Sequence, residues 1–116
     1  FPVATTAFSE SCYVKDYWRG PTWVNNNYLI IEGLKRYGYK DIARELADIT
    51  ISEIARWYEK TGVLWELYDS EGEQCAGDFI KMGAIMTKRL RCLTSGAVAD
   101  FGWTSALFVH LVNEKF

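Results

Sequence analysis

Residues 41–60 read DIARELADITISEIARWYEK, and this stretch decides the fold. Its apolar side chains recur near every third or fourth position and are predicted to face inward: Ile42, Leu46, Ile49, Ile54, Trp57 and Tyr58. Charged side chains occupy the other face and are predicted to meet solvent: Lys40, Arg44, Glu45, Asp48, Glu53 and Glu59. A period near 3.6 residues is typical of an amphipathic helix. We therefore expect a long helix over 41–60, ended by Thr61–Gly62.

A second helix is predicted immediately upstream. Gly20–Pro21 favours a helix start, because the φ angle of proline is already helical and its missing N–H is not needed there. The apolar positions that follow fit one helical face: Trp23, Leu29, Ile30 and Leu34. Gly38 is a suitable cap for the far end. Since only Tyr39–Lys40 separates the two helices, they are expected to form an αα-hairpin.

The remaining segments predict loops and one further helix. Residues 1–16 are irregular, and residues 63–78 are rich in turn residues, with one short extended piece at Val63–Tyr68. A helix over 79–93 is weakly indicated. A final amphipathic helix is predicted from about Trp103, and no alternating strand pattern is sustained. The fold class is therefore all-α, with long loops between the helices.

Composition limits the classes of function. The chain has 116 residues, the size of one small domain, and 49% of them are hydrophobic. Its net charge is −2 and basic residues form no large cluster, which argues against a nucleic-acid partner. No signal peptide opens the chain and no apolar run reaches the ~18 residues of a membrane span. Since the chain begins at Phe1 without a methionine, we expect a processed product or an excised segment.

The cysteine count bears on redox compartment and metals. Cys12, Cys75 and Cys92 make an odd number without CxxC spacing, which indicates free thiols and a reducing compartment. The sequence therefore predicts a cytoplasmic location. The single histidine, His110, makes a zinc site built from His and Cys ligands improbable, and an ordinary place at the core edge is expected for it.

Three segments carry residue types suited to chemistry, and all lie in loops or at helix starts. The segment YWRGPTWVNNNY at 17–28 places two tryptophans beside an arginine and three asparagines. Indole faces stack on sugar rings, while amide and guanidinium groups bind hydroxyls. Alternatively, each tryptophan could fill space between helices, and Arg19 could form an ordinary ion pair. Three consecutive asparagines oppose helix formation, which suggests that at least one has a specific role.

The other two segments are WELYD at 65–69 and DFGWTS at 100–105. Glu66 stands between bulky apolar residues, an environment that suits general acid–base catalysis when the carboxyl is buried. An exposed glutamate is the alternative. The letters DFG alone do not indicate a kinase, because the glycine-rich loop and the catalytic-loop signature are absent from the sequence.

Together the three segments resemble glycoside hydrolase family 63, which includes processing α-glucosidase I and bacterial hydrolases of glucosylglycerate and mannosylglycerate. The stretch from residue 17 to 39 is similar to the family pattern YWRGP-x-W-x-N-x-NYL-x-x-x-GL-x-x-YG. WELYDSEGEQCAG and DFGWTSAL are similar to a later loop and helix start of the family. The matches follow the family's order and cover most of residues 17–107.

The resemblance implies an (α/α)6 barrel, with residues 1–116 as a single segment of its C-terminal portion. It implies hydrolysis, with inversion, of an α-glucosidic bond in an oligosaccharide or small glucoside. Glu66 matches the general base of the family, whereas the general acid lies outside this chain. The partners implied are a carbohydrate substrate and the N-terminal remainder of the same barrel. Water is the second substrate, and neither a cofactor nor a metal is expected.

The resemblance also implies a set of substrate-binding residues. They are Tyr17, Trp18, Arg19, Gly20, Trp23, Asp100, Phe101 and Trp103. The sequence departs from the family pattern at Ser70, where the family has proline, and at Asp100, where some relatives have glutamine. Residues 79–99 look like an insertion before the last helix. A non-catalytic carbohydrate-binding module, or a helical interaction module, is the alternative function.

Overall fold

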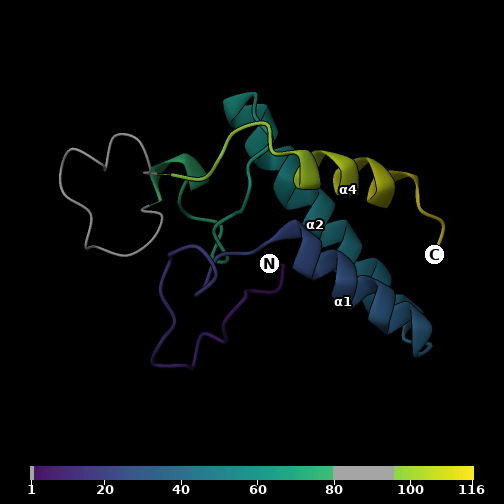
Figure 1. The fold of residues 1–116 in the computed structure, drawn as a ribbon. Coiled ribbons are helices and arrows are strands. Elements are labelled where there is room, and N and C mark those ends of the chain that lie inside the picture. The colour runs from purple at the N-terminus through teal and green to yellow at the C-terminus, as the bar shows by residue number, and fades with distance from the viewer. Residues whose placement is uncertain (1, 80–95) are drawn as a thin grey trace.

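A computed structural model describes residues 2–79 and 96–116, and over these residues the protein is all-α, as predicted (Figure 1). The elements are α1 (Val24–Arg36), α2 (Lys40–Thr61), a 3-10 turn η1 (Ala76–Asp78) and α4 (Gly102–Asn113). Within the described ranges the only β pairing recorded is an isolated antiparallel bridge between Thr22 and Tyr68. Of the extended piece predicted over Val63–Tyr68, only Tyr68 takes part in this pairing. The helix weakly indicated over 79–93 falls almost entirely outside the described residues.

The first two helices form the predicted αα-hairpin. Gly38 adopts a φ of 85°, and the Tyr39 N–H donates to the carbonyl of Leu34 at 2.9 Å, which closes the turn after α1. Gly62, with a φ of 71°, ends α2 in the same left-handed conformation. Glycine is favoured at both places because other residues are strained there.

Helix α1 begins three residues later than the Gly20–Pro21 signal predicts. The N–H and the carbonyl of Thr22 both pair with Tyr68, each at 2.9 Å, and this bridge requires extended backbone. Trp23 is still extended, with a ψ of 130°, and the helix starts at Val24. A tertiary contact with a distant loop therefore overrides the local preference for a helix start.

The core lies where α4 crosses the hairpin and packs against both of its helices. Its buried members are Ile31, Ala43, Leu46, Ala47 and Leu111. Burial of an Ile or Leu side chain contributes about 2 kcal/mol each. A second cluster, with Ile54 and Trp57 of α2, joins the helices to Tyr68 in the loop region.

Two details of the predicted helix faces are wrong. Ile42 and Tyr58 of α2 were expected inside but are exposed. Glu53 was expected outside but is buried, because Trp57 Nε1 and Arg56 both donate to its carboxylate. A buried charge that is paired and hydrogen-bonded in this way avoids most of the desolvation cost of an isolated one.

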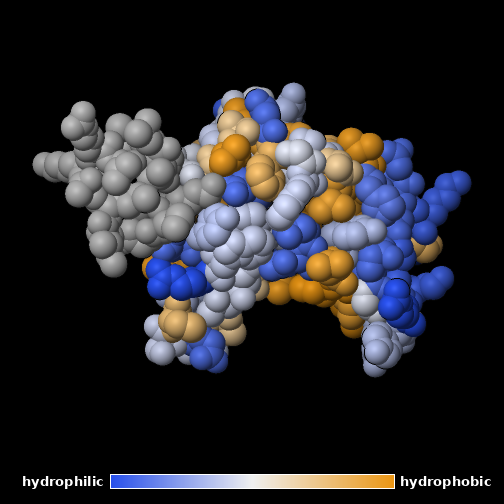
Figure 2. Space-filling view, viewed as in Figure 1, coloured by the Kyte–Doolittle hydropathy of each residue, from blue (hydrophilic) through white to orange (hydrophobic). Residues whose placement is uncertain are grey.

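Large apolar residues also reach the surface of α1 and α4. They are Leu29, Ile30, Trp103, Val109 and Val112. Figure 2 shows hydrophobic surface, in orange, interspersed with hydrophilic residues, in blue, over the helical part. Among the described residues, no helix combines the length and the apolar character needed to cross a bilayer.

Candidate active site

The three motif segments meet in the irregular region on the left of Figure 1, beside the N-terminal ends of α1 and α4. The Thr22–Tyr68 bridge joins the first segment to the second. The third joins the second through the N–H of Phe101, which donates to the carbonyl of Leu64 at 3.0 Å. Thr104 adds a hydrogen bond of 2.7 Å from its hydroxyl to the Trp65 carbonyl. These contacts bring the three segments together in one region of the molecule.

Glu66 lies inside this junction. Its side chain is buried, with 5% of the residue exposed. The backbone N–H of Val98 donates to Oε2 of Glu66 at 3.1 Å, and the Glu66 N–H donates to the Val98 carbonyl at 2.9 Å. The carboxylate is thus fixed by a backbone pairing, which holds it in one orientation. Of the two alternatives for Glu66, the buried carboxyl is the one observed.

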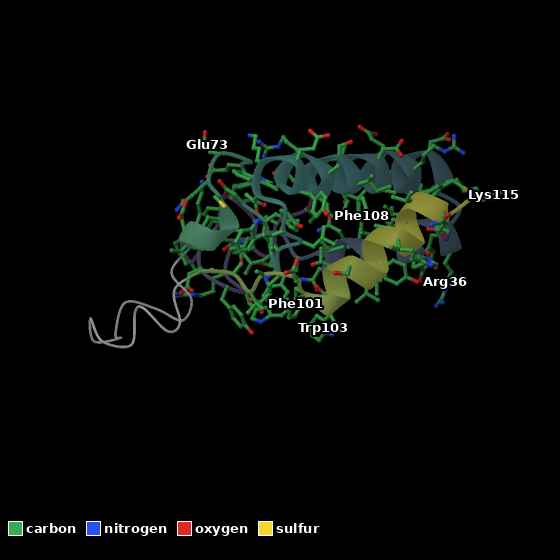
Figure 3. All side chains as sticks on the ribbon, turned by 90° about the horizontal axis from the view of Figure 1, so that it is seen from above. Arg36, Glu73, Phe101, Trp103, Phe108 and Lys115 are labelled. Atoms are coloured by element: carbon green, nitrogen blue, oxygen red, sulfur yellow. The ribbon has the colours of Figure 1, made fainter. Side chains whose placement is uncertain are left out.

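Aromatic rings form a continuous group in the same region, where Leu67, the residue after Glu66, packs in one cluster with Trp23. Trp18 stacks on Trp23, with ring centroids 3.6 Å apart and planes 9° from parallel. The ring of Tyr17 stands edge-on to both indoles, and Trp23 Nε1 donates to the Tyr17 carbonyl at 2.9 Å. Phe101 meets Trp23 edge to face at 6.4 Å and Trp103 at 5.4 Å. Figure 3 shows Phe101 and Trp103 at the loop end of α4, while Phe108 lies between α4 and α2.

The two indoles of this group have different surroundings. Trp23 is 1% exposed, because Trp18 covers one of its faces and the cluster of Leu67, Ala76 and Phe79 packs around it. Trp18 is 39% exposed. Trp23 therefore serves the core in the described structure, and the indole surface available for stacking belongs to Trp18.

The other residues that the sequence singled out take different places. Arg19 forms an ion pair with Asp16 at 2.6 Å, which is the ordinary alternative considered for it. Gly20 is buried, and a Cβ on it would come within 2.3 Å of the Val14 carbonyl oxygen. Its immediate role is therefore to allow a close backbone approach. Asp100 is exposed and has a φ of 52° just before α4.

Asn27 explains part of the asparagine run. It is fully buried, its Oδ1 accepts from the Val3 N–H at 2.8 Å, and its Nδ2 donates to the carbonyls of Val3 and Trp23. The amide therefore binds the N-terminal segment to the first turn of α1. The expected specific role for at least one asparagine is confirmed.

Sequence reasoning missed Asp69, which organises the loop after Glu66. This carboxylate is buried and accepts backbone N–H groups from Glu71, Glu73 and Gln74 at 2.8–3.2 Å. Lys15 adds an ion pair of 3.0 Å. Burial by itself opposes ionisation, but these hydrogen bonds outweigh it and lower the pKa of Asp69. An aspartate followed by Ser-Glu-Gly is a turn signal that could have identified this role.

Lys15 belongs to the loop before the first motif, so its ion pair with Asp69 links that loop to the second segment. Burial works against its charge, but hydrogen bonds to Glu71 and Asp69 raise the pKa of Lys15 overall. Ser70, also unassigned by the sequence, donates from its hydroxyl to the Gly20 carbonyl at 2.6 Å. Ser70 stands where the family pattern has proline, and its side-chain hydrogen bond connects this loop to the first motif.

Arg56 of α2 is a further residue without a sequence signal. It pairs with Glu53 through two nitrogens, at 2.6 and 2.9 Å, and donates to the Gly72 carbonyl at 2.8 Å. The pair therefore connects the long helix to the loop that Asp69 organises.

One group of potential metal ligands lies away from these loops, where Glu32 of α1 meets His110 of α4 and Glu114. Lys35 forms ion pairs with both glutamates. The hydrogen bonds to Glu114 and Glu32 raise the pKa of Lys35, so its ammonium supplies the positive charge that this group favours. The arrangement works as an ion-pair cluster that fastens the C-terminal segment to α1.

Cys12 and Cys75 both carry free thiols, and Cys92 lies outside the described residues. Phe79 and Gly96, the two residues on either side of the stretch that the structure does not describe, lie next to each other, because the Gly96 N–H donates to the carbonyl of Phe79. Residues 79 and 96–99, parts of the presumed insertion, pack within the site region.

These features define a helical fragment whose loops hold a buried carboxylate and a cluster of aromatic rings. The chain belongs to glycosyl hydrolase family 63, since the model of the family's C-terminal domain matches residues 4–84. The predicted resemblance is thereby confirmed.

Several curated relatives support this membership. Alpha-glucosidase 2 of Arabidopsis thaliana is 39% identical over 132 residues, covering 100% of this chain and 14% of that protein. Mannosylglycerate hydrolase of Rubrobacter radiotolerans is 49% identical over 98 residues, covering 84% of this chain and 16% of that protein. Mannosyl-oligosaccharide glucosidase of Arabidopsis thaliana is 34% identical over 85 residues, covering 60% of this chain and 10% of that protein. The chain therefore spans less than a fifth of the length of these relatives.

Proposed function

We propose that this chain is the C-terminal segment of a glycoside hydrolase that cleaves an α-glucosidic bond with inversion, and that Glu66 is its general base. The observation that carries the proposal is the buried carboxylate of Glu66, fixed by the Val98 N–H in a loop region that also holds the aromatic group of Trp18, Trp23 and Phe101. Membership of the family and relatives named as glucosidases and mannosylglycerate hydrolases support a carbohydrate substrate.

The chemistry assigned to Glu66 follows from inverting hydrolysis. A carboxylate takes a proton from water while the water oxygen attacks the anomeric carbon, and an acid on the opposite face protonates the departing oxygen. A base in this role needs a fixed orientation toward the water, which a backbone pairing provides better than a mobile side chain. The acid would come from the part of the protein that precedes this segment.

The aromatic group suits the recognition of a sugar ring. Trp18 has an exposed indole face, and Trp103 is exposed at the start of α4. C–H faces of a glucose ring pack on such surfaces, and nearby polar groups then orient the hydroxyls. The other residues inferred to contact the substrate are Tyr17, Arg19, Gly20, Asp100 and Phe101.

The test is Glu66→Gln in the full-length protein, with Glu73→Gln as the matched control. Glu73 lies in the same loop, and its side chain is 78% exposed. Loss of a general base should lower kcat by about 10²–10⁴-fold, while KM for the glucoside stays within a small factor and Glu73→Gln keeps full turnover. Unchanged turnover in Glu66→Gln would remove the base role and favour a carbohydrate-binding module.

Two further measurements sharpen the assignment. NMR of the first-formed sugar should show the anomer opposite to the substrate, and the retained anomer would contradict inversion. Azide added to Glu66→Ala should restore turnover and yield the β-glucosyl azide, since a small anion can replace the missing carboxylate and its water.

We also propose that the rest of the same protein covers the apolar residues exposed on α1 and α4, as the remaining helices of an (α/α)6 barrel. Each of these residues is more than a third exposed in this segment, and an apolar surface can mark a contact with another part of a protein. The intact mass of the native polypeptide tests this proposal. A mass several times 13.3 kDa is expected, and a mass near that value would contradict it.

A further inference from the structure

The position of the Glu66 carboxylate depends on Val98, which belongs to the segment that returns after residue 95. The Val98 N–H donates to Oε2, and the Val98 carbonyl accepts from the Glu66 N–H. Any displacement of the Val98 backbone therefore moves the group that orients the carboxylate. What fixes Val98 is consequently part of how Glu66 is placed.

The backbone before Val98 is held against η1 and its neighbours. The Ala97 N–H donates to the Ala76 carbonyl at 2.9 Å, and the Gly96 N–H donates to the Phe79 carbonyl. Gly96 has a φ of 90°, and a Cβ on it would lie 2.2 Å from the carbonyl oxygen of Gly77. Both the backbone conformation and the close approach therefore require glycine at residue 96.

The same contact continues to the residue before Glu66. A Cβ on Gly77 would meet the ring of Trp65 at 2.8 Å, so Gly77 lies directly between Gly96 and that indole. The backbone of Trp65 is fixed in turn, because its N–H donates to the Tyr68 hydroxyl at 3.2 Å. The packed pair of glycines is thus connected to Glu66 by two routes, through the Val98 backbone on one side and through Trp65 on the other.

We propose that Gly96, packed on Gly77, is a positioning residue for the general base: the pair sets the Val98 amide at the distance that orients the Glu66 carboxylate. The inference rests on the proposed function, because it concerns how Glu66 is held for its role. It predicts that enlarging either glycine lowers turnover without weakening substrate binding.

The first test is Gly96→Ala in the full-length protein. The new methyl group must push Gly96 away from Gly77, and displacement of a catalytic group by about 1 Å can cost about 10²-fold in rate. We expect kcat to fall by that factor, with KM changed less than about threefold. A kcat within twofold of the wild type would overturn the proposal.

Gly38→Ala is the matched control. Gly38 has a similar φ of 85°, but a Cβ there would meet no atom within 4 Å, and the residue lies at the far end of the hairpin. This variant carries the same backbone strain and should lower the melting temperature while leaving kcat unchanged. An equal loss of kcat in Gly38→Ala would show that general destabilisation, not positioning, explains Gly96→Ala.

Gly77→Ala serves if Gly96→Ala does not fold. Its methyl group meets the end of the Trp65 ring, which can shift more readily than backbone. We expect kcat to fall by about tenfold with KM retained, and an unchanged kcat would overturn the proposal.

A double-mutant cycle separates this inference from the proposed function. If Gly96 acts through Glu66, Gly96→Ala should cost little further turnover in a Glu66→Gln background. Full multiplication of the two losses would assign Gly96 a role independent of Glu66. If Glu66→Gln itself keeps turnover, the proposed function fails. If Glu66→Gln is inactive and Gly96→Ala is fully active, only the positioning inference fails.

Discussion

The helical hairpin and the loop region of this protein are held together by different forces. In the helices the backbone hydrogen bonds are internal, and the packing is apolar between α1, α2 and α4. In the loops, polar and charged residues are buried and hydrogen-bonded: Asp16, Thr22, Glu66, Asp69 and Ser70. Large apolar residues are exposed in both regions, but most buried polar groups of the described loops are hydrogen-bonded, with the Tyr13 hydroxyl as an exception. The conformation of the loops is therefore determined by more specific contacts than that of the helices. The helices provide a frame whose exposed apolar residues need further packing.

The largest effect should come from removing the central carboxylate of the loops. Asp69→Ala leaves three backbone N–H groups without their acceptor and removes one of the two close carboxylate partners of Lys15, and breaking a buried charged network of this kind costs about 3 kcal/mol or more. The free energy of unfolding of the full-length protein, measured with urea, checks this. Asp48→Ala, at an exposed position of α2, should change it by less than about 0.5 kcal/mol. Equal effects of the two substitutions would contradict the contrast between helices and loops.

Acid should weaken the same network by a smaller amount, because protonation removes the charge but keeps the side chain. The pKa of Asp69 is lowered in the folded protein. Its contribution to stability is therefore complete above the unfolded value of about 3.9 and is lost as the pH falls through the lower folded value. Unfolding free energies measured below about pH 4 should fall more steeply for the wild type than for Asp69→Asn, which cannot be protonated there. Parallel curves for the two proteins would show that Asp69 does not contribute.

The sequence predicted the helices well because their signals are local. The period of apolar residues in α2 and the glycines at positions 38 and 62 act within a few residues of the structure that they determine. The buried Glu53 is an exception because its carboxylate accepts hydrogen bonds from Arg56 and Trp57, one turn further along the same helix, and the apolar period does not report such a pairing. The delayed start of α1 arises instead from a tertiary contact, since Thr22 pairs with Tyr68, 46 positions away in the chain.

For the candidate site, the motifs identified the segments but not the arrangement within them. Glu66 and the aromatic residues were found because their types suit sugar chemistry. The roles of Asp69 and Gly96 depend on backbone groups, and no residue type reports where a backbone amide will lie. Trp23 shows that residue type alone can also mislead. Its indole is suited to stacking on a sugar, but Trp18 covers it in the folded protein.

A moderate effect is expected where the loops leave no room for a methyl group. In Gly20→Ala the new Cβ would lie 2.3 Å from the Val14 carbonyl oxygen, which is backbone and cannot rotate away. Overpacking of this kind costs about 2 kcal/mol, and the Ser70 hydroxyl would also lose its place on the Gly20 carbonyl. Urea unfolding of the full-length protein measures the loss. A change below about 0.5 kcal/mol would mean that the first motif adapts more freely than its buried contacts indicate.

The smallest effect, with the opposite sign, is expected for Gly33→Ala in the middle of α1. A Cβ at this position meets no atom within 4 Å, and alanine in a helix interior is favoured over glycine by about 0.5–1 kcal/mol. The free energy of unfolding of the full-length protein should therefore rise by about that amount. A loss of stability would mean that another part of the protein packs closely on this side of α1. In the whole folded protein the helices would then be packed as tightly as the loops. The difference between helices and loops would hold only for this segment taken by itself.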